Sequence, residues 1–203
     1  MTSDPPYPKG EICGSCQSKQ MFDIIHGMNR RILLGVTGSI AAYKSAELVR
    51  LFVKAGDDVR VVMTPAATEF VSPLTFQTLS RNPVYVEEFK RPAEWRPEHI
   101  SLADADLVVV APATANTIAK MRYGLADNLL TSTILATRAP VAIAPAMNDG
   151  MWENEATRDN IAALERRGVK IIAPGYGDLA CGTSGLGRMA EPVEIIGALG
   201  IDV

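Results

Sequence analysis

The chain has 203 residues, of which 47% are hydrophobic and 21% charged, and these proportions exclude a disordered or fibrous protein and favour a globular one. Its formal net charge of -3, without any run of lysine and arginine, excludes a nucleic-acid-binding surface and gives no reason to expect a membrane as a partner. The sequence contains neither an apolar run of the roughly 20 residues needed to cross a bilayer nor a signal-peptide pattern, so we expect a cytoplasmic protein.

The first part of the chain is polar and rich in turn-forming residues. We expect residues 1–29 to be an extension ahead of one folded domain over residues 30–203. The extension holds Cys13 and Cys16 in a Cys-x-x-Cys spacing, which also occurs in zinc and redox sites. A structural zinc ion needs four ligands and only His26 could add a third from this segment, so we assign no metal site.

From residue 30 onward, short β-branched runs alternate with amphipathic helical patterns. This alternation predicts a doubly wound α/β fold, a flavodoxin-like or Rossmann-like parallel sheet with helices on both faces. The expected strands are residues 32–36, 59–63, 107–111, 141–144 and 169–172. The expected helices are residues 41–52 with a stop at Gly56, a short one starting near Ser101, and residues 114–121, 127–137 and 155–167. The segments 89–98 and 173–190 are expected to be loops.

The turn after the first expected strand has the composition of an anion-binding loop. Glycine lets the backbone approach a ligand closely, the free amides of the next helix attract an anion, and Ser39 adds a hydroxyl beside Gly38. The full GxGxxG pattern is missing, and the second strand ends at Met63 and Thr64 without the acidic residue that would hold a dinucleotide ribose. The phosphate of a mononucleotide is therefore favoured over NAD, and a plain tight turn is the alternative.

Two later strand ends also carry polar residues. Thr114 and Asn116 follow the third expected strand, and Asn148 follows the fourth, with Met151 soon after. Thr114 alone is explained as a helix cap. Because parallel strands end at one edge of the sheet, these residues are expected to meet where this fold binds its ligand.

Two further residues could carry chemistry. An isolated histidine is more often structural, but His99 precedes the short helix expected from Ser101, and a helix N-terminus disfavours the imidazolium, which would leave a neutral base near pH 7. A free cysteine is usually a small buried residue. Cys181, however, is followed by Gly182 in a glycine-rich stretch, so it is poorly placed for burial and could be delivered to a site by loop closure.

Together these segments resemble the homo-oligomeric flavin-containing cysteine decarboxylases over nearly all of residues 31–194. Residues 145–152, PAMNDGMW, match the PxMNxxMW motif of that family, and residues 180–189 are similar to its substrate-recognition flap. Residues 112–117 and 124–131 are similar to its other shared segments. The most similar branch acts on phosphopantothenoylcysteine and occurs in the N-terminal half of the bifunctional bacterial coenzyme A enzyme.

The resemblance implies an FMN cofactor and assigns it to particular residues. The residues implied to hold its phosphate are Gly38, Ser39 and Ile40. Those implied to contact FMN elsewhere are Thr114, Ala115, Asn116, Thr117 and Met147. Related enzymes often carry hydroxyl residues after the second strand, where this chain has Ala66 and Ala67, so no side-chain contact is carried over there.

The resemblance also implies how the substrate is handled. His99 corresponds to the catalytic histidine, Asn148 to the residue that grips the substrate carboxylate and amide, and Cys181 to the proton donor of the flap. Further substrate contacts are implied for Met151, Ala180, Gly182, Arg188 and Met189. A homotrimer, in some members assembled into a dodecamer, is the implied quaternary structure.

The implied reaction converts (R)-4'-phospho-N-pantothenoylcysteine to 4'-phosphopantetheine through a thioaldehyde and an enethiolate. FMN oxidises the thiol, and the resulting C=S group accepts the electrons released with carbon dioxide. Reduced FMN then returns a hydride while Cys181 supplies a proton, so there is no net redox change. Family members that modify lantibiotic peptides lack the flap cysteine and stop at the enethiol, so Cys181 favours the coenzyme A branch. The alternatives are a peptidyl-cysteine decarboxylase and a non-catalytic flavoprotein regulatory subunit. Whether the native chain continues into a synthetase domain stays open.

Overall fold

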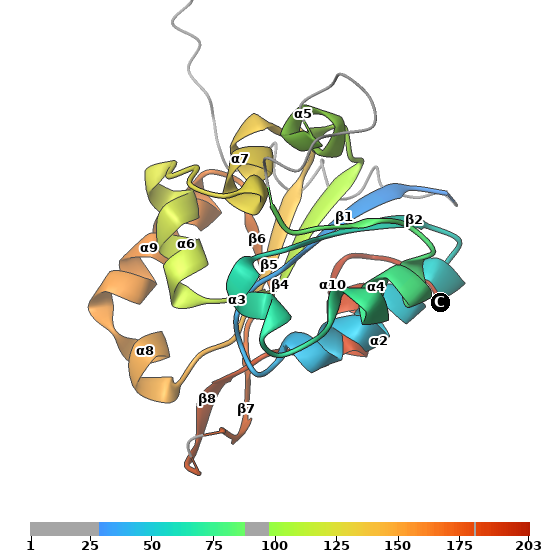
Figure 1. Ribbon diagram of the computed structural model, residues 1–203. Coiled ribbons are helices and arrows are strands. Elements are labelled where there is room, and N and C mark those ends of the chain that lie inside the picture. The colour runs from blue at the N-terminus through green and yellow to red at the C-terminus, as the bar shows by residue number, and fades with distance from the viewer. Residues whose placement is uncertain (1–28, 88–97, 181) are drawn as a thin grey trace, which may run out of the picture.

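The main sheet has the doubly wound topology that the sequence predicts. A computed structural model describes residues 29–87, 98–180 and 182–203 (Figure 1). Its six parallel strands lie in the order β3-β2-β1-β4-β5-β6. Their bounds are β1 (Arg31–Val36), β2 (Asp58–Met63), β3 (Val84–Tyr85), β4 (Leu107–Ala113), β5 (Val141–Pro145) and β6 (Lys170–Ile171). The order reverses between β1 and β4, which is where this fold class binds its ligands.

Helices cover both faces of this sheet (Figure 1). On one face pack α2 (Ala42–Lys54), α4 (Pro73–Ser80) and α10 (Pro192–Ala198). On the other pack α6 (Ala115–Tyr123), α7 (Leu129–Ala136) and α9 (Glu155–Arg166). Three shorter helices are α3 (Pro65–Thr68), α5 (Glu98–Ala103) and α8 (Asp149–Glu153). Within the described ranges, no helix combines the length and hydrophobicity needed to span a membrane.

The strands are apolar on both sides because each face of the sheet carries helices. In β1, Ile32 and Leu34 pack on the α2 side while Leu33 packs on the α6 side. All residues of β4 are buried, as expected for a central parallel strand. Leu48 and Phe52 project from one side of α2 into the hydrophobic core between the sheet and α2, α4 and α10. This packing fixes the helix against the sheet.

Local signals set the beginning and end of the helices near the carboxyl edge. Thr114 caps α6, since its side chain accepts a hydrogen bond from the amide of Thr117, as the sequence suggests. The same helix ends at Gly124, which adopts the left-handed conformation with φ 69°. The capping box between Asn128 and Thr131 starts α7.

Two expectations differ from the structure. The segment 173–190, expected to be a loop, contains the antiparallel hairpin of β7 (Gly175–Asp178) and β8 (Ser184–Arg188). Its strands escape notice because glycines occupy the inward positions, so no hydrophobic alternation marks them. The short helix expected from Ser101 begins at Glu98, which places His99 inside its first turn. The other expected loop falls almost entirely on residues 88–97, which lie outside the described part of the chain.

A buried ion pair closes the edge of the sheet at which β1 begins. The guanidinium of Arg30 donates from Nε to Asp57 Oδ1 and from Nη2 to Asp57 Oδ2, both at 2.8 Å. The Asp57 side chain is 0% exposed and that of Arg30 is 10% exposed. The pair therefore joins the start of β1 to the turn between α2 and β2.

We expect Asp57→Ala to lower the free energy of unfolding by about 3 kcal/mol, because it removes one partner of a buried charge pair. Urea denaturation of the purified protein measures this change. The matched control is Asp104→Ala, which breaks the exposed pair with Arg31 and should leave the midpoint unchanged. Equal midpoints for the two variants would show that the Arg30–Asp57 pair is not important for stability.

Candidate active site

The loops that follow β1 and β4 are joined by one hydroxyl group. Thr37 Oγ1 donates to the carbonyl oxygen of Pro112 at 2.7 Å and accepts from the amide of Thr114 at 3.1 Å. Thr37 is 1% exposed, so both bonds are protected from water. This bridge holds the two loops together at the point where the strand order reverses.

The loop after β1, predicted to bind an anion, is a tight turn that packs against α3. Ser39 Oγ accepts from the amide of Ala41 at 3.3 Å, directly before the N-terminus of α2. A Cβ atom at Gly38 would lie 2.6 Å from the Cβ of Ala66, so only glycine fits at this position. The start of α3 therefore packs against the loop, and backbone groups of both segments lie next to each other.

Thr64 is a residue of this edge that the sequence did not identify. It lies between the end of β2 and the start of α3, and its amide donates to the carbonyl oxygen of Val36 at 3.0 Å. Its Oγ1 is buried and has no hydrogen-bond partner among the described residues. Buried hydroxyl groups are normally bonded, so this atom marks a place where a ligand could supply the missing partner. The only signal in the sequence is a Thr-Pro step at the end of a strand.

A cavity of about 430 Å³ opens at the same edge of the molecule. Its walls come from the start of α2, the segment after β5, and the β7–β8 hairpin. The predicted cofactor and substrate residues that line it are Ser39, Ile40, Met147, Asn148, Ala180, Arg188 and Met189. Segments far apart in the sequence thus meet around one space.

Other predicted residues do not line this cavity. Gly38 lies beside it in the loop described above, and Met151 and Gly182 are exposed residues outside its wall. The α6 start, residues 114–117, is linked to the loop after β1 through Thr37 and is not part of the cavity wall. Thr117 is 4% exposed, and its hydroxyl lies 3.1 Å from Thr114 Oγ1, so the two hydroxyls bond to each other.

The two residues predicted to move protons are His99 and Cys181. The backbone of His99 lies in α5, but its side chain lies outside the described part of the chain. Cys181 also lies outside it, between Ala180, which lines the cavity, and Gly182. Cys13 and Cys16 fall in residues 1–28, likewise outside the description. The roles of these residues stay predictions.

Asn148 lies in the wall and is held in a defined orientation. Its Oδ1 accepts from the amide of Gly150 at 2.8 Å, which makes it the cap of α8. The amide of Met147 donates to the carbonyl oxygen of Gly187 at 3.0 Å. The segment after β5 is thus fixed both by its own helix and by β8.

Close backbone contact explains the glycines of β8. A Cβ atom at Gly187 would lie 2.2 Å from the carbonyl oxygen of Met147, and the residue has φ 141°. At Gly185 a Cβ atom would lie 2.8 Å from the Cβ of Asp149. Glycine at both positions lets the hairpin lie directly on the segment after β5.

The cavity wall carries charges of both signs. Lys44 and Arg188 supply cations and Asp178 a carboxylate, which is hydrogen-bonded to Ser184 Oγ at 2.8 Å. Behind the wall, Lys44 holds the pKa of Glu191 below its ordinary value, mainly through a hydrogen bond, and Arg188 adds to this effect. Glu191 therefore stays ionised at neutral pH and balances both cations.

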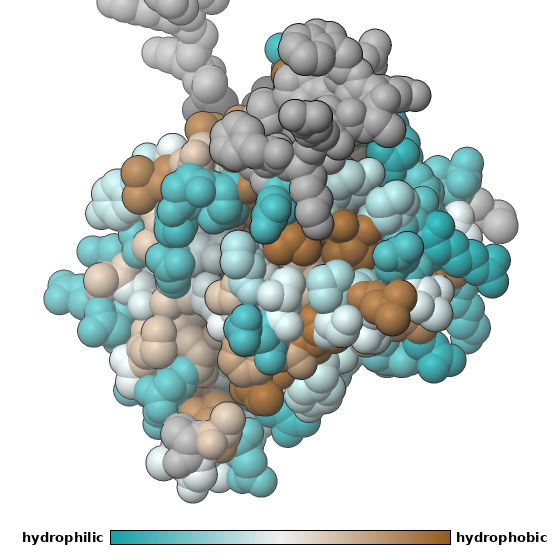
Figure 2. Space-filling model, viewed as in Figure 1, coloured by the Kyte–Doolittle hydropathy of each residue, from teal (hydrophilic) through white to brown (hydrophobic). Residues whose placement is uncertain are grey.

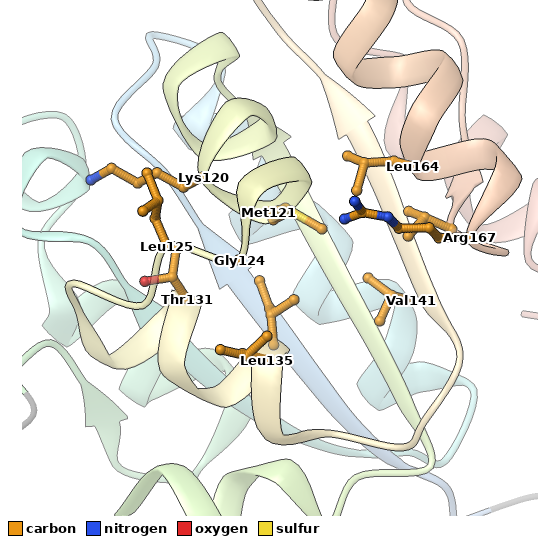
Figure 3. Close-up of a pocket in the computed structure, with 11 residues that line it drawn as sticks. Lys120, Met121, Gly124, Leu125, Thr131, Leu135, Val141, Leu164 and Arg167 are labelled. Carbon is orange, nitrogen blue, oxygen red and sulfur yellow. The ribbon is translucent and has the colours of Figure 1, made fainter. Parts of the chain in front are cut away.

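A second hollow of about 160 Å³ lies between α6, α7, α9 and the start of β5 (Figure 3). Its floor is apolar, and Lys120 and Arg167 stand at its border. Lys120 Nζ donates to Asp127 at 2.6 Å, which lowers the pKa of that carboxyl group, and Arg167 Nη1 donates to the carbonyl oxygen of Arg122 at 2.6 Å. The border cations are thus engaged within the protein, and the hollow lies away from the predicted site residues.

Known proteins resemble this chain over most of its length. The sequence profile of the Flavoprotein family matches residues 26–200. The coenzyme A biosynthesis bifunctional protein CoaBC of Vibrio parahaemolyticus is 51% identical over 168 residues, which make up 82% of this chain and 42% of that protein. The probable phosphopantothenoylcysteine decarboxylase of Streptococcus mutans is 48% identical over 172 residues, 83% of this chain and 96% of that protein. The chain thus spans less than half the length of its bifunctional relatives.

Solved structures show the same fold. A PPC decarboxylase mutant complexed with pantothenoylaminoethenethiol superposes with a TM-score of 0.76 at 34% identity, covering 85% of this chain and 97% of that one. The FMN binding protein AtHal3 superposes with a TM-score of 0.73 at 35% identity, covering 85% of this chain and 95% of that one.

We expect Gly187→Ala to destabilise the protein by about 1–3 kcal/mol, because alanine is strained at this φ and its Cβ clashes with Met147. Denaturation measures the loss, and proteolysis should become faster within residues 175–188. Gly197→Ala in α10 is the control: nothing lies within 4 Å of its Cβ position. It should raise stability by about 0.5–1 kcal/mol, as alanine does in a helix. A Gly187→Ala protein as stable as the wild type would contradict the close packing.

Proposed function

The chain belongs to the Flavoprotein family, and we propose that it is a cytoplasmic FMN-dependent enzyme that decarboxylates (R)-4'-phospho-N-pantothenoylcysteine to 4'-phosphopantetheine in coenzyme A biosynthesis. One observation carries the proposal: the loop after β1, the Asn148 segment and the flap hairpin meet around a single cavity. The Streptococcus mutans relative, which the chain matches over nearly its whole length, carries the name of this activity.

The described residues fit an FMN phosphate and flavin ring at the carboxyl edge. Gly38 leaves a cradle that a Cβ atom would fill, Ser39 lies at the start of a 13-residue helix, and Thr64 offers a buried hydroxyl without a partner among the described residues. We assign the phosphate to residues 38–40 with Thr64 as an added donor, and the ring to the side of Met147 and residues 114–117. A bound flavin supplies a reversible acceptor for the electrons of the substrate thiol.

The chain supplies the proton transfers and the orientation of the substrate. His99 is proposed to remove the thiol proton, since a neutral imidazole is a suitable base near pH 7. Asn148 is proposed to hold the carboxylate and amide of the substrate, which its fixed position in the cavity wall supports. Cys181 follows Ala180 of the cavity wall and is proposed to return a proton to the enethiolate.

We also propose that copies of the chain associate, with a homotrimer as the smallest assembly and a dodecamer as a larger one. Large apolar side chains stand exposed beside the cavity, including Ile40 and Tyr43 at 56% and 61%. Figure 2 shows further hydrophobic surface across the middle of one face, over the region of α3 and α4. Phe70 and Leu74 of this region are exposed. Light scattering on the purified protein decides the question, and a monomer at all concentrations would refute the proposal.

His99→Asn is expected to leave the visible flavin absorbance of the purified protein unchanged and to lower kcat by about 100-fold or more, as loss of a general base does. The paired control is His26→Asn, which removes the chain's other histidine and should leave kcat unchanged. Absorbance spectra and a carbon dioxide release assay give both readouts. Wild-type turnover by His99→Asn would remove the assigned role.

The function itself is tested by incubating the wild-type protein with phosphopantothenoylcysteine and weighing the product by mass spectrometry. We expect a mass decrease equal to carbon dioxide alone. Cys181→Ser should instead release a product that lacks two further hydrogens, because the enethiolate is not protonated and reduced. A wild-type product lacking those hydrogens would favour the peptidyl-cysteine type of decarboxylase, and flavin binding without any product would favour the regulatory subunit.

A further inference from the structure

Lys44 is a buried cation to which neither the sequence nor the proposed reaction assigns a role. It lies in the first turn of α2, and its side chain is 7% exposed. Its Nζ donates to Glu191 Oε1 at 2.8 Å and to the carbonyl oxygen of Met189 at 3.1 Å. A buried ammonium group is costly without partners, so these acceptors explain where the side chain lies.

Both acceptors lie at the root of the β7–β8 hairpin, which buries no large side chain of its own. The buried positions of β8 are Gly185 and Gly187, and β7 has no fully buried residue. Tyr176 and Leu186 are exposed by 72% and 42%, and Figure 1 shows the hairpin projecting from the body of the protein. Because the hairpin inserts no large side chain into the core, its orientation depends on contacts at its root.

These root contacts lie on two sides of the cavity. On one side the amide of Met147 binds the carbonyl oxygen of Gly187. On the other, Glu191 Oε1 accepts from Lys44 and also from Arg188 Nη2 at 2.6 Å. One carboxylate thus joins α2, the end of β8 and the start of α10.

We propose that Lys44 is a positioning residue that forms, with Glu191, a latch between α2 and the root of the hairpin. The latch holds the end of β8, where Gly187 and Arg188 line the cavity, against α2. Its effect on turnover rests on the function proposed above, whereas its effect on the hairpin does not. Lys44 also lines the cavity, so the test has to separate loss of the latch from loss of a positive charge.

Lys44→Met is the first variant, because methionine is long and apolar and Glu191 keeps Arg188 as its partner. We expect amide hydrogen exchange within residues 175–188 to become about 10-fold faster, while exchange in β1 and β4 stays at the wild-type rate. Flavin absorbance should be retained. With phosphopantothenoylcysteine, KM should rise by about 10-fold and kcat should change by less than about 3-fold, since the flap binds substrate.

Three further variants distinguish loss of the Lys44–Glu191 latch from loss of a positive charge in the cavity wall. Glu191→Gln weakens the latch and leaves the Lys44 charge in the wall, so it should also accelerate hairpin exchange, to a smaller extent. Lys44→Arg keeps a cation that can reach Glu191, so the hairpin should keep most of its wild-type protection from hydrogen exchange. Glu194→Ala removes the bond that the Glu191 amide donates to the Glu194 carboxylate at the start of α10, and it should leave hairpin exchange unchanged.

Unchanged hairpin exchange in both Lys44→Met and Glu191→Gln would overturn the latch, even if KM rises, because the effect would then belong to the charge in the wall. Faster exchange throughout the sheet would overturn it as well, since Lys44 would then support the whole fold. The exchange measurement needs no substrate. If the wild-type protein fails to decarboxylate phosphopantothenoylcysteine, the proposed function falls and the latch is still decided.

Discussion

The candidate site depends on the hydroxyl group of Thr37, which joins the loops at the point where the strand order reverses. Parallel strands on either side of this point send their connections to opposite faces, so the loops after β1 and β4 diverge. By bonding Pro112 and Thr114 at once, Thr37 keeps the divergent loops in contact. The loop after β1 and the start of α6 therefore lie next to each other, as the FMN site proposed above requires.

The wall of the cavity formed by the β7–β8 hairpin is held by close backbone packing. There the flap hairpin lies on the segment after β5 through backbone contacts, and glycines at 185 and 187 make this approach possible. Such a contact buries little apolar surface, so it stabilises the hairpin weakly compared with a packed strand. In the reaction proposed above, a hairpin that admits and releases substrate would benefit from this weakness, provided that its root is fixed.

The sequence predicts the sheet well and the flap poorly, for physical reasons. Buried parallel strands such as β4 are continuous apolar runs, and Gly56 and Thr114 mark helix boundaries, so these elements are visible in one sequence. The hairpin has no apolar alternation and was expected to be a loop. Ser39 and Asn148 of the cavity wall can be predicted from the composition of strand ends, and its other predicted residues only from the resemblance. Thr64 and Lys44 were not predicted, because their roles follow from burial and from partners distant in sequence.

The ion pairs of Glu191 with Lys44 and Arg188 connect the hairpin to the body of the protein. Glu191 has a folded-state pKa below its ordinary value because of Lys44 first and Arg188 second, so its contribution to stability is present above the unfolded pKa and is lost only as the pH falls through the folded value. At neutral pH the carboxylate is therefore ionised. The Lys44–Glu191 pair therefore ties the root of the hairpin to α2 in the pH range in which a neutral imidazole can act as a base. The proposed reaction needs both a fixed hairpin root and a neutral base, and the same pH range satisfies both.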